Sequence, residues 1–329
     1  MLYSLIIPVF NRPEEIETVL ACLAKQTYKQ FEIIIVESGS TTTAEHVVKG
    51  FQDQLDAHWY MYKNDGQGYS RNYGMTKAKG DYFVILDSDI LLENTYLERL
   101  NDALQTNYVD AFGGPDRYHS SFSSTQKAVD HVMTSLFTTG GIRGGKKHVG
   151  KFYPRSFNMG FSREVYNKTK GYKWPFFGED IELSKRIMSL GFTTGLIPEA
   201  FVYHKRKTSL KGHWKQMHFF GRARINIYKE FPDTLKVTHF FPAAFTLFLL
   251  TIPLSFLIHP LLGILSTSIL GFYLFLIFLS GTVKYKNVAV GLIALPATFT
   301  QMVGYGSGFL KDFTKRIVLG QEYHFKNKD

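Results

Sequence analysis

One short stretch, residues 82–89, constrains this chain more than any other. It runs from Tyr82 to Leu86 without a charge and then carries two carboxylates, Asp87 and Asp89, one residue apart. An uncharged apolar run of this length is typical of a buried strand. Because residues i and i+2 of an extended chain point to the same side, both carboxylates can converge at the strand end. Two such oxygen ligands suit Mg²⁺ or Mn²⁺, especially beside a diphosphate. The alternative is a solvated turn, since Asp and Ser favour turns.

The segments before this stretch alternate between strand-like and helix-like patterns. Residues 2–9 and 31–36 read as buried strands, and a further strand is expected near residues 59–62. The first helix is expected from Pro13, because proline and acidic residues are typical of a first helical turn. A glycine-rich loop over residues 64–74 leads into another helix. This alternation predicts a largely parallel sheet in a layered αβα domain.

Three of the predicted strands end in polar clusters, at residues 8–11, 37–40 and 87–89. Clusters that converge on one sheet edge are the expected geometry of a nucleotide site. The glycines of Gly66-Gln67-Gly68 would let backbone amides approach a phosphate, and Arg71 would supply a fork of donors. The spacing is not that of a dinucleotide-binding fingerprint.

Two later segments carry candidates for function. Glu179 and Asp180 follow Gly178 at the start of a predicted amphipathic helix. They serve there either as capping and dipole-compensating residues or as a general base and its neighbour. The basic, glycine-rich residues 140–148 read as a surface loop, with a lid or a contact to an acceptor phosphate as the alternative.

The carboxyl-terminal third predicts membrane segments. No Asp, Glu, Lys or Arg occurs from Phe240 to Val283, which is about twice the ~20 residues that span a bilayer. His259-Pro260 is a natural turn, so two spanning helices are expected, over about 240–258 and 261–283. A third apolar segment, 288–310, has basic residues at both ends. A re-entrant or interfacial segment would keep both basic ends on one side, in line with the positive-inside tendency, and is preferred to a full span.

The remaining composition agrees with a membrane-attached protein of a reducing compartment. The net charge is +10, and residues 205–236 mix basic with aromatic side chains. This segment resembles a membrane-surface helix, with a helix packed on the catalytic domain as the alternative. The single cysteine, Cys22, excludes an internal disulfide framework. Neither a nucleic-acid motif nor a signal peptide is apparent, so the amino-terminal domain is expected in the cytoplasm and no nucleic-acid partner is expected.

The motifs, taken in order, resemble glycosyltransferase family 2, whose members are inverting enzymes with the GT-A fold. The resemblance covers about residues 2–230, and its elements are residues 7–12, 36–40, 68–74, 80–89 and 178–183. It implies an α/β GT-A domain, a Rossmann-like αβα arrangement with a mostly parallel mixed sheet. We place this catalytic domain at residues 1–230, including a basic interfacial helix from about 205, and the helical membrane region at residues 231–329.

The resemblance also implies roles for matching residues. Asp89 should ligate a divalent metal, Mn²⁺ or Mg²⁺, while Asp87 should support the metal or contact the ribose. Asp180 should be the catalytic base, with Glu179 beside it. His204 is a further candidate ligand of the metal or the diphosphate, with a structural histidine as the alternative. The other expected contacts to the nucleotide sugar are Pro8, Phe10, Asn11, Glu37, Gly68, Arg71 and Ser88.

The function implied is metal-dependent, inverting transfer of a sugar from a nucleotide sugar, with UDP favoured, to a hydroxyl of a lipid-linked glycan. Such a transferase would serve exopolysaccharide or surface-glycan synthesis at the inner (plasma) membrane. Glu37-Ser38 stands where the family usually has an acid pair, which puts the base of the nucleotide in question. The stretch from Gln216 lacks the Arg-Trp of processive synthases, which disfavours polymer extrusion. The alternatives are a polyprenyl-phosphate sugar synthase and a catalytically inactive membrane scaffold. A sugar nucleotidyltransferase is disfavoured because residues 10–13 lack its glycine-rich basic loop.

Overall fold

A computed structural model describes residues 1–139, 152–176 and 178–322. The glycine-rich residues 140–148 lie outside the described residues. The chain divides into two compact units. Residues 1–119, 152–176 and 178–205 belong to the first unit, and residues 120–139 and 206–322 to the second.

The first unit is built on a seven-stranded sheet with the order β3-β2-β1-β4-β8-β6-β9. The strands β1 to β4 pair in parallel, whereas β8 runs antiparallel to both β4 and β6. The mostly parallel mixed sheet confirms the predicted fold class. The strands are β1 (Tyr3–Val9), β2 (Phe31–Ser38), β3 (Ala57–Tyr62), β4 (Tyr82–Leu86), β6 (Ala111–Gly113), β8 (Asn158–Ser162) and β9 (Thr194–Leu196).

Helices cover both faces of this sheet, because alternate strand residues are apolar on either side. Leu5 and Ile7 of β1 pack in one core, and Ile6 packs in the other. The first core takes side chains from α1 (Pro13–Ala24), α2 (Glu45–Phe51) and α4 (Tyr96–Thr106). The second takes side chains from α3 (Gln67–Lys77), α7 (Arg163–Thr169) and α8 (Glu179–Ser189). Burial on both faces is the reason that the strands read as continuous apolar runs.

A second, three-stranded sheet in the same unit has the order β5-β10-β7. Its strands are β5 (Ile90–Leu91), β10 (Val202–His204) and β7 (Asp116–Arg117). The sequence did not predict β5 or β7, because strands of two residues carry no periodic pattern. The small sheet matters for function because β5 follows Asp89 directly and pairs with the strand that ends in His204.

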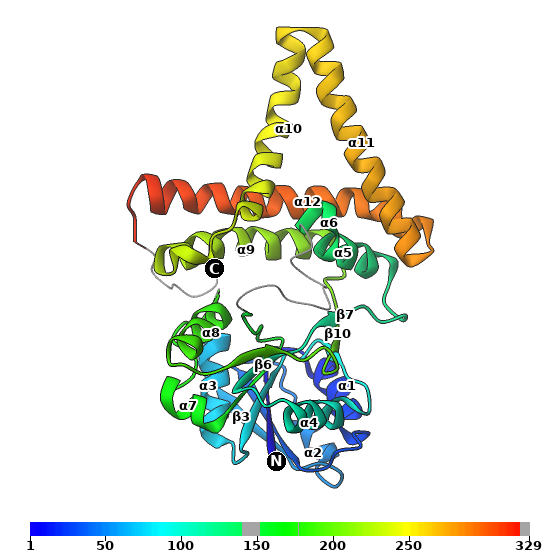
Figure 1. Ribbon diagram of the computed structural model, residues 1–329. Coiled ribbons are helices and arrows are strands. Elements are labelled where there is room, and N and C mark those ends of the chain that lie inside the picture. The colour runs from blue at the N-terminus through cyan, green and yellow to red at the C-terminus, as the bar shows by residue number, and fades with distance from the viewer. Residues whose placement is uncertain (140–151, 177, 323–329) are drawn as a thin grey trace. The chain divides into compact units, whose positions relative to one another are not determined.

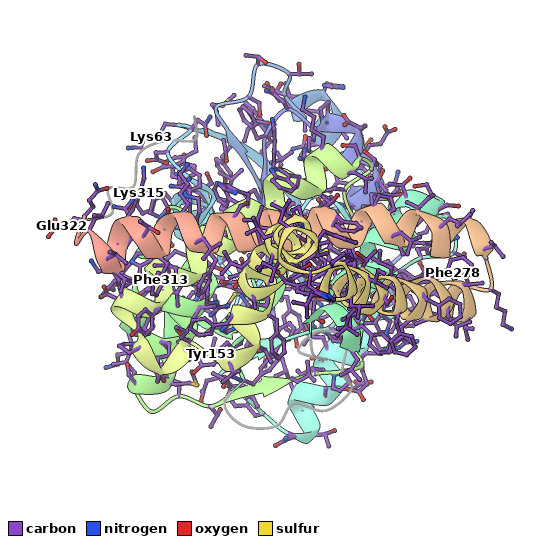
Figure 2. The ribbon with its side chains drawn as sticks, turned by 90° about the horizontal axis from the view of Figure 1, so that it is seen from above. Lys63, Tyr153, Phe278, Phe313, Lys315 and Glu322 are labelled. Atoms are coloured by element: carbon purple, nitrogen blue, oxygen red, sulfur yellow. The ribbon has the colours of Figure 1, made fainter. Side chains whose placement is uncertain are left out.

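The second unit is helical. Figure 1 shows α10 and α11 as a hairpin whose two helices converge at their connection and stand on α12. Figure 2 looks down α10 and shows α12 lengthwise, with Phe313 and Lys315 at the end remote from Phe278 of α11. The helices are α5 (Ser124–Thr134), α6 (Leu136–Thr139), α9 (Leu210–Glu230), α10 (Phe241–Ile258), α11 (Pro260–Tyr285) and α12 (Val288–Asp312), with short turns η1 (Pro232–Thr234), η2 (Val237–Phe240) and η3 (Phe313–Val318).

Three helical segments in the described residues are long and apolar enough to cross a membrane: 237–258, 260–285 and 288–318. The first two agree with the predicted pair. The third segment, α12, continues unbroken through Pro296, and its placement as a re-entrant or interfacial segment stays a prediction. Its glycines do not break it: Gly304 and Gly308 let it approach the side chains and backbone of α9.

The compact units divide the chain elsewhere than at the predicted boundary of residue 230. The second unit already begins at Arg206 and also takes in residues 120–139. Helix α5 belongs to it because Ala128 and Val132 pack against Val290 and Ala294 of α12. The assignment of catalysis to residues 1–230 and of membrane binding to 231–329 stays a prediction.

Candidate active site

The centre of the candidate site is a group of three possible metal ligands, Asp87, Asp89 and His204. One ligand atom from each lies within 4.8 Å of the other two. His204 Nε2 is 2.9 Å from Asp89 Oδ1. The two carboxylates come together because they follow β4 at alternate positions of an extended chain. Two carboxylate oxygens and an imidazole nitrogen form a donor set that fits a divalent cation such as Mn²⁺.

His204 reaches this group through the small sheet. Strand β10 runs antiparallel to β5, with His204 opposite Ile90, the residue that follows Asp89. The backbone N–H of Lys205 donates to the carbonyl oxygen of Asp89 at 2.8 Å. The imidazole also stacks on the ring of Phe157, with centroids 5.2 Å apart. These contacts bring together residues that are 115 positions apart in the chain.

Arg71, on α3, connects the metal-ligand group to the second pair of acids. Its buried guanidinium donates to Asp87 Oδ1 at 3.0 Å and to Glu179 Oε1 at 2.9 Å. Gln67 donates to the same Glu179 oxygen at 2.6 Å. Arg71 therefore holds two carboxylates that lie 92 positions apart (179 − 87) and keeps its own charge paired.

Both carboxylates that Arg71 holds have perturbed protonation. Burial raises the pKa of Asp87, and the charge of Asp89 adds to the rise, while Arg71 and His204 oppose it. The side chain of Asp87 is still 31% exposed, so the raised pKa belongs to a group that a ligand can reach. Burial also raises the pKa of Glu179, with Asp180 adding to the effect and Arg71 opposing it. Perturbed pKa values of this kind are frequent at functional sites.

Asp180 opens α8 beside Glu179 but differs from it in its surroundings. Gly178 precedes the helix with a φ of 86°, a left-handed conformation that glycine adopts without strain. Asp180 Oδ1 accepts from the backbone N–H of Ile181 at 2.8 Å, and Oδ2 lies 3.5 Å from the guanidinium of Arg155. Part of the Asp180 side chain remains exposed. Glu179 is thus a buried partner of Arg71, whereas Asp180 is open to an incoming group.

The loops after β1 and β2 are joined by Asn11. Its Oδ1 accepts from the backbone N–H groups of Thr41 and Thr42 at 2.8 and 2.9 Å. Asn11 has a φ of 53°, a region that asparagine tolerates better than most residues. Pro8 and Phe10 flank this connection, and Phe10 is exposed at its rim. The predicted clusters at the ends of β1 and β2 therefore adjoin one another.

Glu37 lies at the carboxyl end of β2 and is fully buried. Its Oε2 accepts from the backbone N–H of Ala44 and from Trp59 Nε1, at 2.9 and 3.1 Å. Its Oε1 has no hydrogen-bond partner among the described residues. A buried carboxylate oxygen without a partner is costly, which makes Glu37 a candidate acceptor for a donor group of a ligand.

Gly68 lies in a different setting from the one predicted. Its backbone N–H donates to the carbonyl oxygen of Pro175 at 3.0 Å, and a Cβ there would lie 2.2 Å from the carbonyl oxygen of Trp174. The close approach that this glycine allows is to residues 172–175, which lead to Glu179 and Asp180. The contact of Gly68 with the nucleotide stays a prediction. In this structure the backbone N–H of Gly68 is already bonded to Pro175.

The structure adds partners that the sequence analysis did not assign. Glu15 of α1 accepts from Ser88 Oγ at 2.7 Å. Arg12 pairs with Glu15 and lies 3.7 Å from Asp89. Arg12 directly follows the polar cluster of residues 8–11 and belongs to the motif of residues 7–12, which was the available signal. Glu15 gave none, because an acid in a first helical turn is common for reasons of the helix dipole alone.

The sequence profile described as Glycosyl transferase family 2 matches residues 4–169, about half of the chain and most of the sheet that carries this site. The chain belongs to glycosyl transferase family 2. By class it is therefore a glycosyltransferase, as the resemblance of its motifs predicted.

Relatives with curated names point the same way. An uncharacterised glycosyltransferase of Haemophilus influenzae is 34% identical over 34% of this chain and 46% of its own length. Glycosyltransferase GlyG of Streptococcus pneumoniae is 30% identical over 34% of this chain and 38% of the relative. A chondroitin synthase of Pasteurella multocida is 26% identical over 61% of this chain and 24% of the relative. The chain spans less than half the length of each of these relatives.

Among solved structures, the mannosyltransferase PcManGT from Pyrobaculum calidifontis, in complex with GDP-Man and Mn²⁺, has a similar fold. Its TM-score is 0.55 at 14% sequence identity, over 92% of this chain and 87% of that one. A likeness at this identity confirms the fold, and the fold agrees with the GT-A prediction.

Proposed function

We propose that this family 2 enzyme uses a divalent cation to transfer a sugar, with inversion, from a nucleoside-diphosphate sugar to a hydroxyl of a lipid-linked glycan. The observation that carries the proposal is the meeting of Asp87, Asp89 and His204 at the carboxyl end of β4. Parallel sheets bind their ligands at this edge. The catalytic unit would work at the cytoplasmic face of the plasma membrane.

The three ligands favour Mn²⁺ over Mg²⁺. Mg²⁺ prefers an all-oxygen shell, whereas an imidazole nitrogen suits Mn²⁺ better. A cation held by Asp87, Asp89 and His204 would neutralise charge on the departing diphosphate. Arg71 would keep Asp87 oriented toward that site, because the Arg71–Asp87 contact fixes one carboxylate oxygen and leaves the other available.

The nucleoside would lie over the loops after β1 and β2. Glu37 offers a buried oxygen without a partner among the described residues, and Asn11 joins the two loops into one surface. Pro8 and Phe10 add an apolar rim, and Ser88 lies between the two aspartates, bonded to Glu15. Such a surface has one acceptor for an N–H or O–H group of the nucleoside and apolar contacts beside it.

We assign the role of catalytic base to Asp180. It can take the proton of an acceptor hydroxyl as that oxygen attacks the anomeric carbon and the bond to the diphosphate breaks. Glu179 beside it is buried against Arg71 and serves to position the pair. The apolar hairpin of the second unit supports an acceptor that is held in a membrane.

The test is donor hydrolysis and transfer by the detergent-solubilised full chain, assayed with UDP- and GDP-sugars and Mn²⁺. We expect turnover of one donor, its loss in EDTA, and its recovery on adding Mn²⁺. His204→Gln keeps a neutral polar side chain but weakens the ligand set, so it should raise the Mn²⁺ concentration for half-maximal activity by about 10-fold or more. Full turnover in EDTA would refute the metal-dependent mechanism.

A further inference from the structure

The hairpin formed by α10, α11 and His259 exposes apolar side chains on all sides. Among the largest exposures are Leu257 at 83%, Ile258 at 76% and Leu261 at 67%. These three lie at its tip, next to the one-residue connection. A contiguous apolar surface of this kind does not stay in water, so the hairpin has a bilayer around it.

The tip has the chemistry of a membrane interior. The connection is Ile258-His259-Pro260-Leu261, and no Asp, Glu, Lys or Arg lies between Phe240 and Val283. A hairpin that crosses the bilayer completely must place its connection among the far headgroups or in water. Length alone would allow a crossing, because segment 237–258 has 22 residues, or about 33 Å, and α11 has 26 residues, or about 39 Å, against about 30 Å of hydrocarbon. The apolar connection is therefore what argues against a complete crossing. Gly263 packs on the ring of Phe256, which draws the two helices together close to the tip.

The base of the hairpin, in contrast, is fixed to a charged cluster. Buried Asp130 of α5 binds Arg206 at 3.0 Å, the Lys284 ammonium at 3.4 Å and the Tyr285 hydroxyl at 2.5 Å. Lys284 and Tyr285 form the last turn of α11. Charges of this density lie outside the hydrocarbon, so they mark the level at which α11 leaves the membrane.

Helix α12 is tied at both ends to elements at that same level. In its first half, Val290 and Ala294 pack on α5, and at mid-helix Gln301 donates to the carbonyl oxygen of Val132. At its end, buried Asp312 accepts from Arg222 at 3.1 Å and from Asn226 at 3.3 Å, both on α9. Between these points a Cβ on Gly308 would lie 2.0 Å from the carbonyl oxygen of His218.

Helix α9 cannot enter the hydrocarbon, because it carries charge along its length. Its basic residues are Lys211, Lys215, Arg222, Arg224 and Lys229. Because α12 packs closely along α9, both helices lie at the same depth in the membrane. Both views show α12 crosswise to α10 rather than beside it (Figures 1 and 2). A transmembrane α12 would carry the cations of α9 into the bilayer.

We propose that the chain is monotopic: the hairpin enters the bilayer from one side and ends inside the hydrocarbon. Helices α9 and α12 lie in the interface on the side of entry, with the cations of α9 among anionic headgroups. The segments before α10 and after α12 are then on the same side. Nothing of the described chain is exposed on the other side.

Cysteine labelling tests this arrangement, because Cys22 is the single cysteine and Cys22→Ser gives a clean background. Four single-cysteine variants are compared in sealed vesicles of both orientations with a membrane-impermeant maleimide. They are Asp53→Cys in the catalytic unit, Val237→Cys before α10, His259→Cys at the tip and Glu322→Cys after α12. The first, second and fourth should label in one orientation, and the tip only after detergent is added.

Any other labelling result would contradict a specific part of the proposal. Labelling of His259→Cys from the side opposite to Asp53→Cys would show a complete crossing, and labelling from the same side would show a hairpin outside the bilayer. Labelling of Glu322→Cys from the side opposite to Val237→Cys would show that α12 spans. Because His259 caps α11 through Leu261, Leu257→Cys gives a second tip position that keeps the cap.

Discussion

Arg71 is the residue that links the two halves of the candidate site. Its contact to Glu179 is buried and its contact to Asp87 is partly buried, so Glu179 above all depends on Arg71 for compensation of its charge. Removing one partner of a buried ion pair typically costs about 3–5 kcal/mol, because it leaves an uncompensated charge. This geometry separates Glu179, which is held by Arg71, from Asp180, which is not, and two predictions rest on the difference.

The first prediction concerns Asp180 as base. Asp180→Asn keeps the shape and still accepts from the N–H of Ile181, so the fold should lose little stability. It cannot accept a proton, so transfer to a sugar hydroxyl should fall by roughly 10²-fold or more. Donor affinity, measured by calorimetry, should be unchanged. Near-normal transfer would remove Asp180 as base and favour a phosphate acceptor, whereas a variant that neither binds nor folds would assign it to capping.

The second prediction concerns the raised pKa of Glu179. At pH values between the ordinary pKa of a glutamate and the raised pKa of Glu179, the folded state binds more protons than the unfolded state. The free energy of unfolding therefore falls as the pH rises through this range. Glu179→Gln removes this loss. The melting temperature of the variant relative to wild type should therefore increase from about pH 4 upward and level off above the raised pKa. Glu164→Gln, at an exposed position of α7, should follow wild type. A constant difference across pH would contradict the raised pKa.

Some of these residues could be read from the sequence and others could not. Asp87 and Asp89 were predictable because the two-residue period of a strand is local. His204 was only a candidate, because its place depends on the register of β10 against β5. Glu37 and Arg71 were expected to contact the nucleotide. The hydrogen bonds of Glu37 with Trp59 and of Arg71 with Glu179 join residues that are far apart in the chain, so no local pattern predicts them.

At the scale of elements, the contact between α9 and α12 organises the second unit. Gly221 of α9 faces the backbone of α12, where a Cβ would lie 2.1 Å from the carbonyl oxygen of Tyr305. Gly308 faces the backbone of α9 in return. Small residues on both helices allow close backbone approach. No local sequence pattern predicts this contact, because the two helices lie some 80 residues apart in the chain (305 − 221 = 84).

The third prediction tests that contact. Gly221→Ala places a methyl group against the carbonyl oxygen of Tyr305, so it should cost about 1–3 kcal/mol through overpacking. Gly271→Ala on α11 is the matched control, because nothing lies within 4 Å of its Cβ, and alanine is the better helix former by up to about 1 kcal/mol. Thermal unfolding of the detergent-solubilised chain should show a lower melting temperature for Gly221→Ala alone. Equal melting temperatures would mean that the two helices do not pack this closely.

At the scale of the whole molecule, the chain combines an α/β unit that carries the candidate site with a helical unit that exposes apolar surface. The apolar segments were predictable, because an uncharged apolar run longer than 20 residues is typical of a membrane helix. The membership of residues 120–139 in the helical unit was not, because it depends on α5 packing against α12. The predicted division into a catalytic part and a membrane-binding part can be tested by determining which exposed apolar residues contact lipid.

The last prediction compares two sets of exposed apolar residues. The tip set is Leu254, Leu257 and Leu261, which are 55%, 83% and 67% exposed; the base set is Val237, Val318 and Leu319, at 76%, 65% and 60%. In water, replacing either set by aspartate would have a similar, small effect. In a bilayer each tip substitution should cost about 2.5–3.5 kcal/mol, whereas the base set lies near polar headgroups. After carbonate washing, wild type and the base variant should therefore stay in the membrane fraction, and the tip variant should be released or degraded. Equal retention of both variants would show that the tip does not lie in hydrocarbon.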